Sequence, residues 1–557
     1  MKAIDGEPFS VDVTDPPSAG SDLDGRRKRE VGLSGRGRAV HLGNGAAFET
    51  AAQQIVDRRT ADWKGIAHGE TFRRHPIKSA PFDRFGSGTR SVKGQGIRRE
   101  DMTDLPESVV GDARTSSFAW GLLEDLADVG NRMAGQEGER RGAELVCEAF
   151  DSAGLADAEI VEFEIPGWWR GDSSLRISGP LERTHDESHE VIALPGTPAD
   201  TVSGPLVDVG TGSYDDFADA GEELQGAIVM ASSESPDSSD RWIHRMEKYV
   251  NAADRGAAGF VFRNHIEGAL PPTGEIGYHE RPGPIPAVGV SAEVGDRLAR
   301  LAADHDGEND APVVELDVDC RNEPATSRNV QATVGPADAD REVLVTAHVD
   351  GHDISDGAND NAAGCAAVAG VGRLLARVAD DLDCRVRIVT FGAEEIGLWG
   401  AYHCAESLPK EAVKCVVNLD GACNSRNLRV GTNGFATVGD VFESVTDDYD
   451  APLSTGDTIS PHGDQWAFVQ EGIPAVMVST TSDQSGRGWG HTHADTLDKL
   501  DPRDLTEVVT LVTEAVYRLA DDDLEPTHTT SQRIREKMDD GYIQELEVGG
   551  RLPDDWD

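Results

Sequence analysis

From about Thr326 onward, short apolar runs with β-like composition alternate with helical stretches. This alternation is typical of a doubly wound, mostly parallel sheet flanked by helices, because each helix returns the chain to the start of the next strand. The fold class predicted is therefore α/β. We expect strands at Val343–Ala347, Arg385–Phe391, Cys415–Leu419 and Ala475–Ser479, and helices at Asn361–Ala379 and Asp504–Leu519. Before this region, the alternating pattern of Ala158–Ile165 predicts a further strand.

Acidic and imidazole side chains follow these strands, or nearly so. In open α/β sheets the carboxyl ends of the strands share one crevice, which collects residues distant in sequence. Taken singly, each segment has an ordinary explanation, such as a solvated loop at His348 or a helix cap at Asp360. Their shared placement predicts one site. The segments are His348-Val-Asp350, Asn359-Asp360-Asn361, Glu394-Glu395, Asp420 and His491-Thr-His493-Ala-Asp495.

Two histidines with several carboxylates form a ligand set suited to Zn²⁺ or a similar divalent ion. Asp350 can orient the His348 imidazole, since a ligating histidine commonly donates its second N–H to a carboxylate. A carboxylate at Asp360 can bridge two cations. Glu394 and Glu395 are adjacent, so one can bind metal while the other faces the water. No cysteine is placed to act as a ligand.

These segments resemble the motifs of co-catalytic di-zinc exopeptidases, the family of bacterial leucyl aminopeptidases and vacuolar aminopeptidase Y, over roughly residues 116–520. The resemblance implies the zinc exopeptidase fold. The matching segments are Ala347-His-Val-Asp350, Gly357-Ala-Asn-Asp-Asn-Ala-Ala-Gly364, Gly392-Ala-Glu-Glu395, Asn418-Leu-Asp420, His491-Thr-His-Ala-Asp-Thr496, Asn131-Arg-Met-Ala-Gly135 and Gly472-Ile-Pro-Ala475. A looser resemblance implies an inserted β-rich protease-associated domain, through Gly226-Ala-Ile-Val229, the Asn251-Ala-Ala253 region and Ile285-Pro-Ala287.

Carried over by motif, the resemblance implies two divalent metal ions, expected to be Zn²⁺. Asp360 would bridge both ions. His348 and Asp420 would complete one metal site, and Glu395 and His491 would complete the other. The set is therefore two histidines and three carboxylates for two ions.

The resemblance also implies roles for residues around the metals. Glu394 would be the general base, and Asp350 would support His348 from behind. The peptide bond after the bridging aspartate is often cis in this family, which here is the bond between Asp360 and Asn361.

Three positions depart from the family pattern. Many relatives place a tyrosine just before the last histidine, where this chain has Gly490, so the residue that assists the oxyanion is unassigned. The family's Ser-Asp-His segment appears as Gly463-Asp464-Gln465. His352-Asp353 adds a second His/Asp pair in the first loop, which we interpret as solvated or supporting rather than ligating.

The leading hypothesis is a metal-dependent exopeptidase that removes N-terminal residues from peptides through a metal-bridging water activated by Glu394. Dipeptidase- or carboxypeptidase-type enzymes and glutaminyl cyclases share the fold, and the strand-end motifs do not separate them. A non-catalytic binding protein on this scaffold is disfavoured, because receptor-like relatives have lost metal ligands that are all present here. The lack of a GxSxG elbow disfavours a serine hydrolase, and the lack of HExxH excludes a thermolysin-like zincin.

The charge is extreme: 52 basic residues, only 10 of them lysine, face 101 acidic ones, for a net charge of -49. Such a surface repels itself at low ionic strength and needs counterions, which indicates a halophilic protein. The alternative is an acidic protein that binds cations or basic partners. Nucleic-acid binding is disfavoured because phosphates would be repelled. Peptides are the expected partners, and the oligomeric state is open.

The seven cysteines are odd in number, irregularly spaced and without a CxxC pair, which predicts reduced thiols in a cytoplasmic protein. We find no run of about 18 apolar residues and no secretory signal, so no membrane segment is expected.

Residues 1–101 differ from the rest, with 18 Lys/Arg against 14 Asp/Glu and a Gly- and Arg-rich composition. They are expected to be a disordered leader with the natural start at Met102; the alternative is a basic arm for an anionic partner. We expect the catalytic domain at residues 102–184 and 321–525, the insert at 185–320 and an acidic tail at 526–557, either mobile or a peripheral helix.

Overall fold

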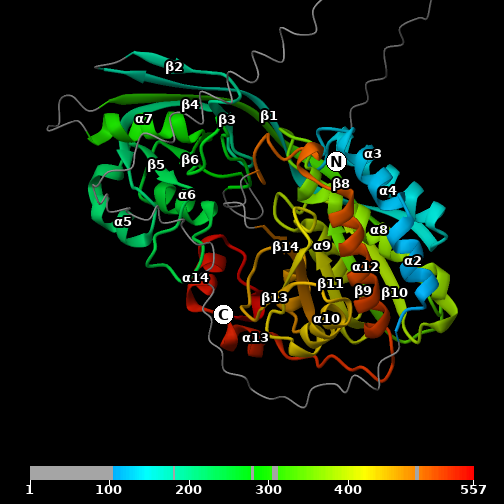
Figure 1. Cartoon of the computed structure of the whole chain (residues 1–557). Coiled ribbons are helices and arrows are strands. Elements are labelled where there is room, and N and C mark those ends of the chain that lie inside the picture. Colours follow the sequence, from blue (N-terminus) through cyan, green and yellow to red (C-terminus); the bar gives the residue numbers. More distant parts are fainter. Residues whose placement is uncertain (1–103, 180–181, 277–281, 304–311, 483–488, 557) are drawn as a thin grey trace, which may run out of the picture. The chain divides into compact units, whose positions relative to one another are not determined.

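The computed structural model describes residues 104–179, 182–276, 282–303, 312–482 and 489–556, all within the compact unit Ser79–Asp557 (Figure 1). The expected leader, residues 1–101, lies outside the described residues. The domain boundaries expected from the sequence stay predictions. All seven cysteines are free.

Four parallel strands form the centre of the sheet, in the order β14-β11-β9-β10. They are β9 (Glu342–His348), β10 (Arg385–Phe391), β11 (Val413–Leu419) and β14 (Ala475–Thr481). Every residue of β9 and β11 is buried, as expected of parallel strands covered on both faces. On one side of these four strands, β8 (Val313–Val334) pairs antiparallel with β10. On the other side, β12 (Asn427–Gly431) pairs antiparallel with β14, and β13 (Leu453–Gly456) pairs parallel with β12. The predicted α/β class with a mostly parallel sheet is confirmed.

Alternate residues of the strands face two helical layers: Val343 and Val345 belong to one apolar core and Leu344 to the other. The first core contains α2 (Glu107–Thr115), α3 (Phe118–Ala127), α4 (Glu137–Ala153), α8 (Ala363–Leu375), α10 (Ala436–Tyr449) and α12 (Pro502–Leu519). The second contains α9 (Trp399–Ser407), α11 (Trp466–Val469), α13 (Ser531–Lys537) and α14 (Asp540–Val548). The described residues also form short helical turns: η2 (Gly221–Leu224), η3 (Ala358–Ala362), η4 (Ala376–Asp381), η5 (Lys410–Ala412), η6 (Leu497–Lys499) and η7 (Asp554–Trp556).

One helical stretch of the described residues, Ala358–Asp381, has the length and composition of a membrane span. It is 78% buried inside the fold, where α8 packs against α12, α4 and β9. Its apolar composition is therefore accounted for by its place in the first core.

A long two-stranded ribbon connects this sheet to the insert. β1 (Ala156–Ser178) pairs antiparallel with β8 from Ala156 to Ser178, whereas the sequence predicted a strand only over Ala158–Ile165. The strand continues through Pro166 and Gly167 because β8 pairs with it along that whole length. β2 (Arg183–His185) pairs with the end of β1.

The insert is built on the other end of the ribbon. Its strands are β3 (Val191–Ala193), β4 (Asp200–Asp208), β5 (Ile228–Ser232), β6 (Gly259–Arg263) and β7 (Ala287–Val290). β4, β5, β6 and β7 are parallel to their neighbours in that order, and β4 also pairs antiparallel with β8. The insert is thus an alternating unit rather than only β-rich, with helices α5 (Tyr214–Ala220), α6 (Arg245–Asp254) and α7 (Ala292–Ala303).

The C-terminal segment is part of the core. Tyr542, Leu546 and Trp556 are each at most 3% exposed, and the Trp556 ring meets that of Trp466 edge-on at 5.9 Å between centroids. The expectation of a mobile tail is therefore wrong for residues 531–556, which form α13, α14 and η7 and contribute apolar side chains to the second core.

Candidate active site

His348 is the last residue of β9 and is fully buried. Its Nε2 atom forms no hydrogen bond within the described residues, although three carboxylates face it. The distances from Nε2 are 3.3 Å to Asp360 Oδ1, 3.7 Å to Asp420 Oδ1 and 3.9 Å to Glu394 Oε2. A buried, unpartnered imidazole nitrogen among acidic oxygens is where a cation fits.

Asp360 lies between two histidines. Oδ1 faces His348, and Oδ2 lies 3.4 Å from His491 Nε2. The Asp360–Asn361 peptide bond is cis, as the resemblance implied. Asp495 fixes the segment, because its carboxylate accepts hydrogen bonds from the backbone N–H groups of Asn359 (3.0 Å) and Asp360 (3.1 Å).

Glu395 lies beside His491 on the second side of Asp360. Its Oε2 is 3.5 Å from His491 Nε2 and 2.9 Å from His352 Nε2. Within the described residues, His/acid ligand atoms gather closely enough for a metal in two groups: His348, Asp360 and Asp420, and His352, Glu395 and His491.

Asp350 supports the glutamate pair as well as His348. Its two carboxylate oxygens accept hydrogen bonds from the backbone N–H groups of Glu394 (3.1 Å) and Glu395 (3.2 Å). The His348 Nδ1 atom lies 3.2 Å from the Asp350 carbonyl oxygen and 3.5 Å from its carboxylate. The preceding Ala393 takes a left-handed backbone (φ 56°), which turns the chain sharply after β10.

Arg132, from the Asn-Arg-Met-Ala-Gly match, fixes the loop that carries these groups. It is 1% exposed, and its guanidinium donates to the carbonyl oxygens of Val349 (3.1 Å), Asp356 (2.6 Å) and Gly357 (2.9 Å) as well as Leu126 (2.9 Å). The backbone at both ends of the loop between β9 and η3 is thereby anchored to the segment that joins α3 and α4.

The crowding of acids shifts their protonation. Burial, reinforced by the charge of Glu395, holds the pKa of Glu394 well above its usual range. Burial and the Asp360 charge raise the pKa of Glu395 to about 7. Burial alone would lower the pKa of His348, but the Glu394 charge and a hydrogen bond with Asp350 raise it well above its usual value. All these shifts express an excess of buried negative charge, which a divalent cation would relieve.

Sequence reasoning assigned no role to Asp495 or Asp464, and it left His352 as either solvated or supporting. Asp495 was only part of a motif, yet it anchors Asp360. Asp464 is fully buried, neither of its carboxylate oxygens has a hydrogen-bond partner among the described residues, and burial raises its pKa well above the usual range. The sequence held one signal for Asp464, which is the aspartate of the segment that corresponds to the family's Ser-Asp-His. His352, expected to be solvated or supporting, is 4% exposed and contacts Glu395.

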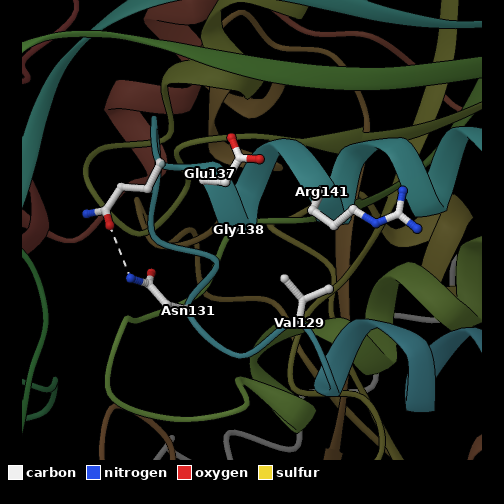
Figure 2. A pocket seen from close by; sticks show the side chains of 6 residues that line it. Val129, Asn131, Glu137, Gly138 and Arg141 are labelled. Atoms are coloured by element: carbon white, nitrogen blue, oxygen red, sulfur yellow. Dashed lines mark hydrogen bonds between the residues drawn. The ribbon is translucent and has the colours of Figure 1, made fainter. Parts of the chain in front are cut away.

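A hollow of about 450 Å³ near the start of α4 is separate from this cluster. Figure 2 shows its lining, which carries none of the histidines or acids described above. Its residues are Val129, Asn131, Gln136, Glu137, Gly138 and Arg141.

Comparison with known families agrees with this geometry. The peptidase family M28 matches residues 329–516, which include every residue of both ligand groups. Residues 329–516 are an M28 peptidase domain. The PA domain family matches residues 202–298, within the insert. The resemblance drawn from the motifs, to the family of bacterial leucyl aminopeptidases with an inserted protease-associated domain, is confirmed.

Proteins similar to this chain align over most of its length. Aminopeptidase YwaD of Bacillus subtilis (strain 168) is 24% identical over 447 residues, covering 76% of this chain and 89% of that protein. Carboxypeptidase Q of Bos taurus is 25% identical over 464 residues, covering 78% and 93%. The crystal structure of a peptidase M28 precursor from Shewanella amazonensis SB2B matches with a TM-score of 0.63 at 25% identity, covering 76% and 97%. The family match does not decide whether residues are removed from the amino end or the carboxyl end of a peptide.

Proposed function

We propose that this chain is a metal-dependent aminopeptidase that uses two divalent ions, and Zn²⁺ is the metal we expect. The observation that carries the proposal is the position of Asp360, whose two oxygens each face a different histidine, 3.3 Å from His348 and 3.4 Å from His491. A carboxylate so placed can bridge two ions.

The donor set fits this assignment. His348, Asp360 and Asp420 would hold one ion. Asp360, Glu395 and His491, whose Nε2 lies within 3.5 Å of both carboxylates, would hold the other, which gives each ion imidazole and carboxylate ligands of the kind Zn²⁺ takes. When bound, such a pair supplies Lewis acidity that activates water and polarises the scissile carbonyl at neutral pH.

Glu394 is placed to move the proton. Its carboxylate reaches the cluster, with Oε2 3.9 Å from His348 Nε2, while its backbone N–H is fixed by Asp350. A carboxylate in this position can accept a proton from a water at the cluster and return it to a leaving group, as a general base must. Glu394 would take the proton of the attacking water and deliver it to the leaving amine.

The aminopeptidase direction is tested by substrate choice. We propose hydrolysis assays of aminoacyl-amides and N-blocked dipeptides in concentrated KCl, with and without added Zn²⁺ or Co²⁺. Cleavage that needs a free amino end supports an aminopeptidase. Cleavage of N-blocked dipeptides would instead support the carboxypeptidase-type alternative, which the likeness to carboxypeptidase Q keeps in view.

The role of Glu394 is tested by Glu394→Gln. Because the amide cannot accept the proton, we expect activity to fall by about 10²–10⁴-fold while metal content is unchanged. Glu406→Gln, an exposed glutamate on α9, is the matched control and should keep full activity. Metal content by elemental analysis and turnover are measured on the same samples. Appreciable turnover by Glu394→Gln would remove the residue from this role.

A further inference from the structure

His352 lies against the two residues expected to hold the second ion. Its Nε2 is 2.9 Å from Glu395 Oε2 and 3.2 Å from His491 Nδ1. The two imidazole rings meet edge-on, at 4.6 Å between centroids and an interplanar angle of 67°. His352 therefore contacts both residues while His491 keeps its own Nε2 turned toward Asp360.

The hydrogen bonds assign the donor. The His352 Nδ1 atom is buried and has no partner among the described residues, so the ring's N–H belongs on Nε2, which faces the Glu395 carboxylate. His491 Nδ1 also lies 3.3 Å from the Thr273 carbonyl oxygen, which accepts an N–H on that nitrogen. In this assignment the 3.2 Å approach of His352 Nε2 to His491 Nδ1 is a contact between the rings and not a hydrogen bond. Both rings are then in the tautomer that favours a cation at the Glu395–His491 pair.

The position of His352 is itself fixed. The next residue, Asp353, forms a bidentate ion pair with Arg170, with oxygens 2.6 and 2.9 Å from the guanidinium. Arg170 also donates to Thr273 Oγ1 at 3.1 Å. The Thr273 backbone in turn donates to the His491 carbonyl oxygen at 2.8 Å, where His491 holds a left-handed conformation (φ 57°).

We propose that His352 is a positioning residue for the second metal ion: its Nε2–H orients the Glu395 carboxylate, and its ring braces His491. Thr273, inside the residues matched by the PA domain, braces His491 from the other side, so the insert helps to shape the metal site. The inference rests on the proposed two-ion function. Hydrogen-bonding partners of metal ligands commonly affect metal affinity by about 10–100-fold.

The test compares His352→Phe, which keeps a ring but has no donor, with His352→Gln, which keeps an N–H donor. Zinc bound per chain is measured by elemental analysis across buffered free-zinc concentrations, and Co²⁺ absorption spectra report the coordination of each equivalent. We expect His352→Phe to bind one ion as the wild type does and the other about 10–100-fold more weakly. His352→Gln should recover most of the loss.

The controls separate this inference from the proposed function. His403→Phe, on α9 with its ring stacked on Phe163 at 5.1 Å, should bind zinc like the wild type. Unfolding of the metal-free proteins shows whether each variant folds. Two ions bound by His352→Phe with wild-type affinity, or equal losses in the Phe and Gln variants, would overturn the role of His352. Fewer than two ions on the wild type would instead contradict the proposed function.

Discussion

Single buried carboxylates set much of the chemistry of this protein. Glu394, Glu395 and Asp464 lie in or beside the metal-ligand groups, and burial raises the pKa of each. Outside those groups, burial raises the pKa of Glu139 to about 8, with the charge of Asp350 as the next cause. A buried acid is costly when ionised, so each of these positions links the stability or activity of the protein to pH or to a bound cation.

The stability of the metal-free protein should depend on pH through Glu139. The pKa of its carboxyl is about 8 in the folded state and near 4.5 in the unfolded chain, so between these values the folded state holds a proton that the unfolded state has released. Stability from this group is therefore full below pH 4.5 and is lost as pH rises to about 8. At about 1.4 kcal/mol for each pH unit, the loss is at most about 5 kcal/mol.

Glu139→Gln imitates the protonated form and should remove this dependence. We expect the variant to be more stable than the wild type at pH 9, and the difference to shrink toward zero near pH 5. Denaturant unfolding in EDTA at several pH values measures it. The Ser327 hydroxyl and the Gly135 N–H both donate to Glu139 in the structure. Ser327→Ala is therefore the control, because it shows how much the loss of one of these hydrogen bonds changes the stability by itself. Parallel pH profiles for Glu139→Gln and the wild type would contradict the prediction.

At the scale of elements, sequence reasoning located the four central strands, because apolar runs and the polar residues at their ends mark them. The range expected for β10 agrees with the structure at both ends, and those for β9, β11 and β14 differ by at most two residues at either end, because apolar runs in a buried parallel sheet are bounded by polar loops. The length of β1 beyond Ile165 depends on pairing with residues of β8 that lie 135 to 158 positions away, and no local pattern records it. The role of His352 could not be decided from the sequence for the same reason, since it contacts Glu395 and His491, which lie far from it along the chain.

The β1–β8 ribbon, the insert and the loop after β9 meet at an ion pair. Arg170 of β1 pairs with Asp353, and the two side chains are only 11% and 10% exposed. Arg170→Met leaves Asp353 as an unpaired, nearly buried charge, so we expect a loss of about 3–5 kcal/mol in the free energy of unfolding. Arg170→Met/Asp353→Asn should lose less than Arg170→Met alone, because the stranded charge is gone. Denaturant unfolding of both variants measures the difference, and an equal loss would show that the ion pair is not the cause.

For the whole molecule, charge is the dominant property. The net charge of -49 is spread over a surface on which, among the described residues, Val313 is the one large hydrophobic side chain that is exposed. Nearly all large apolar side chains of the described residues are therefore at least partly buried, and the mutual repulsion of carboxylates is what opposes the compact state. Whether the protein is halophilic remains a prediction that rests on this balance.

We expect the unfolding temperature to rise steeply with KCl. Salt shortens the range of repulsion from about 10 Å at 0.1 M to about 3 Å at 1 M, which relieves the compact state more than the expanded chain. Recovery of several kcal/mol corresponds to a rise on the order of 10 °C. Calorimetry from 0.1 to 3 M KCl measures it, with choline chloride to separate screening from specific K⁺ binding and sucrose to separate both from general exclusion effects. An unfolding temperature that stays level across the KCl series, or that rises equally in sucrose, would show that acid–acid repulsion does not limit the stability of this protein.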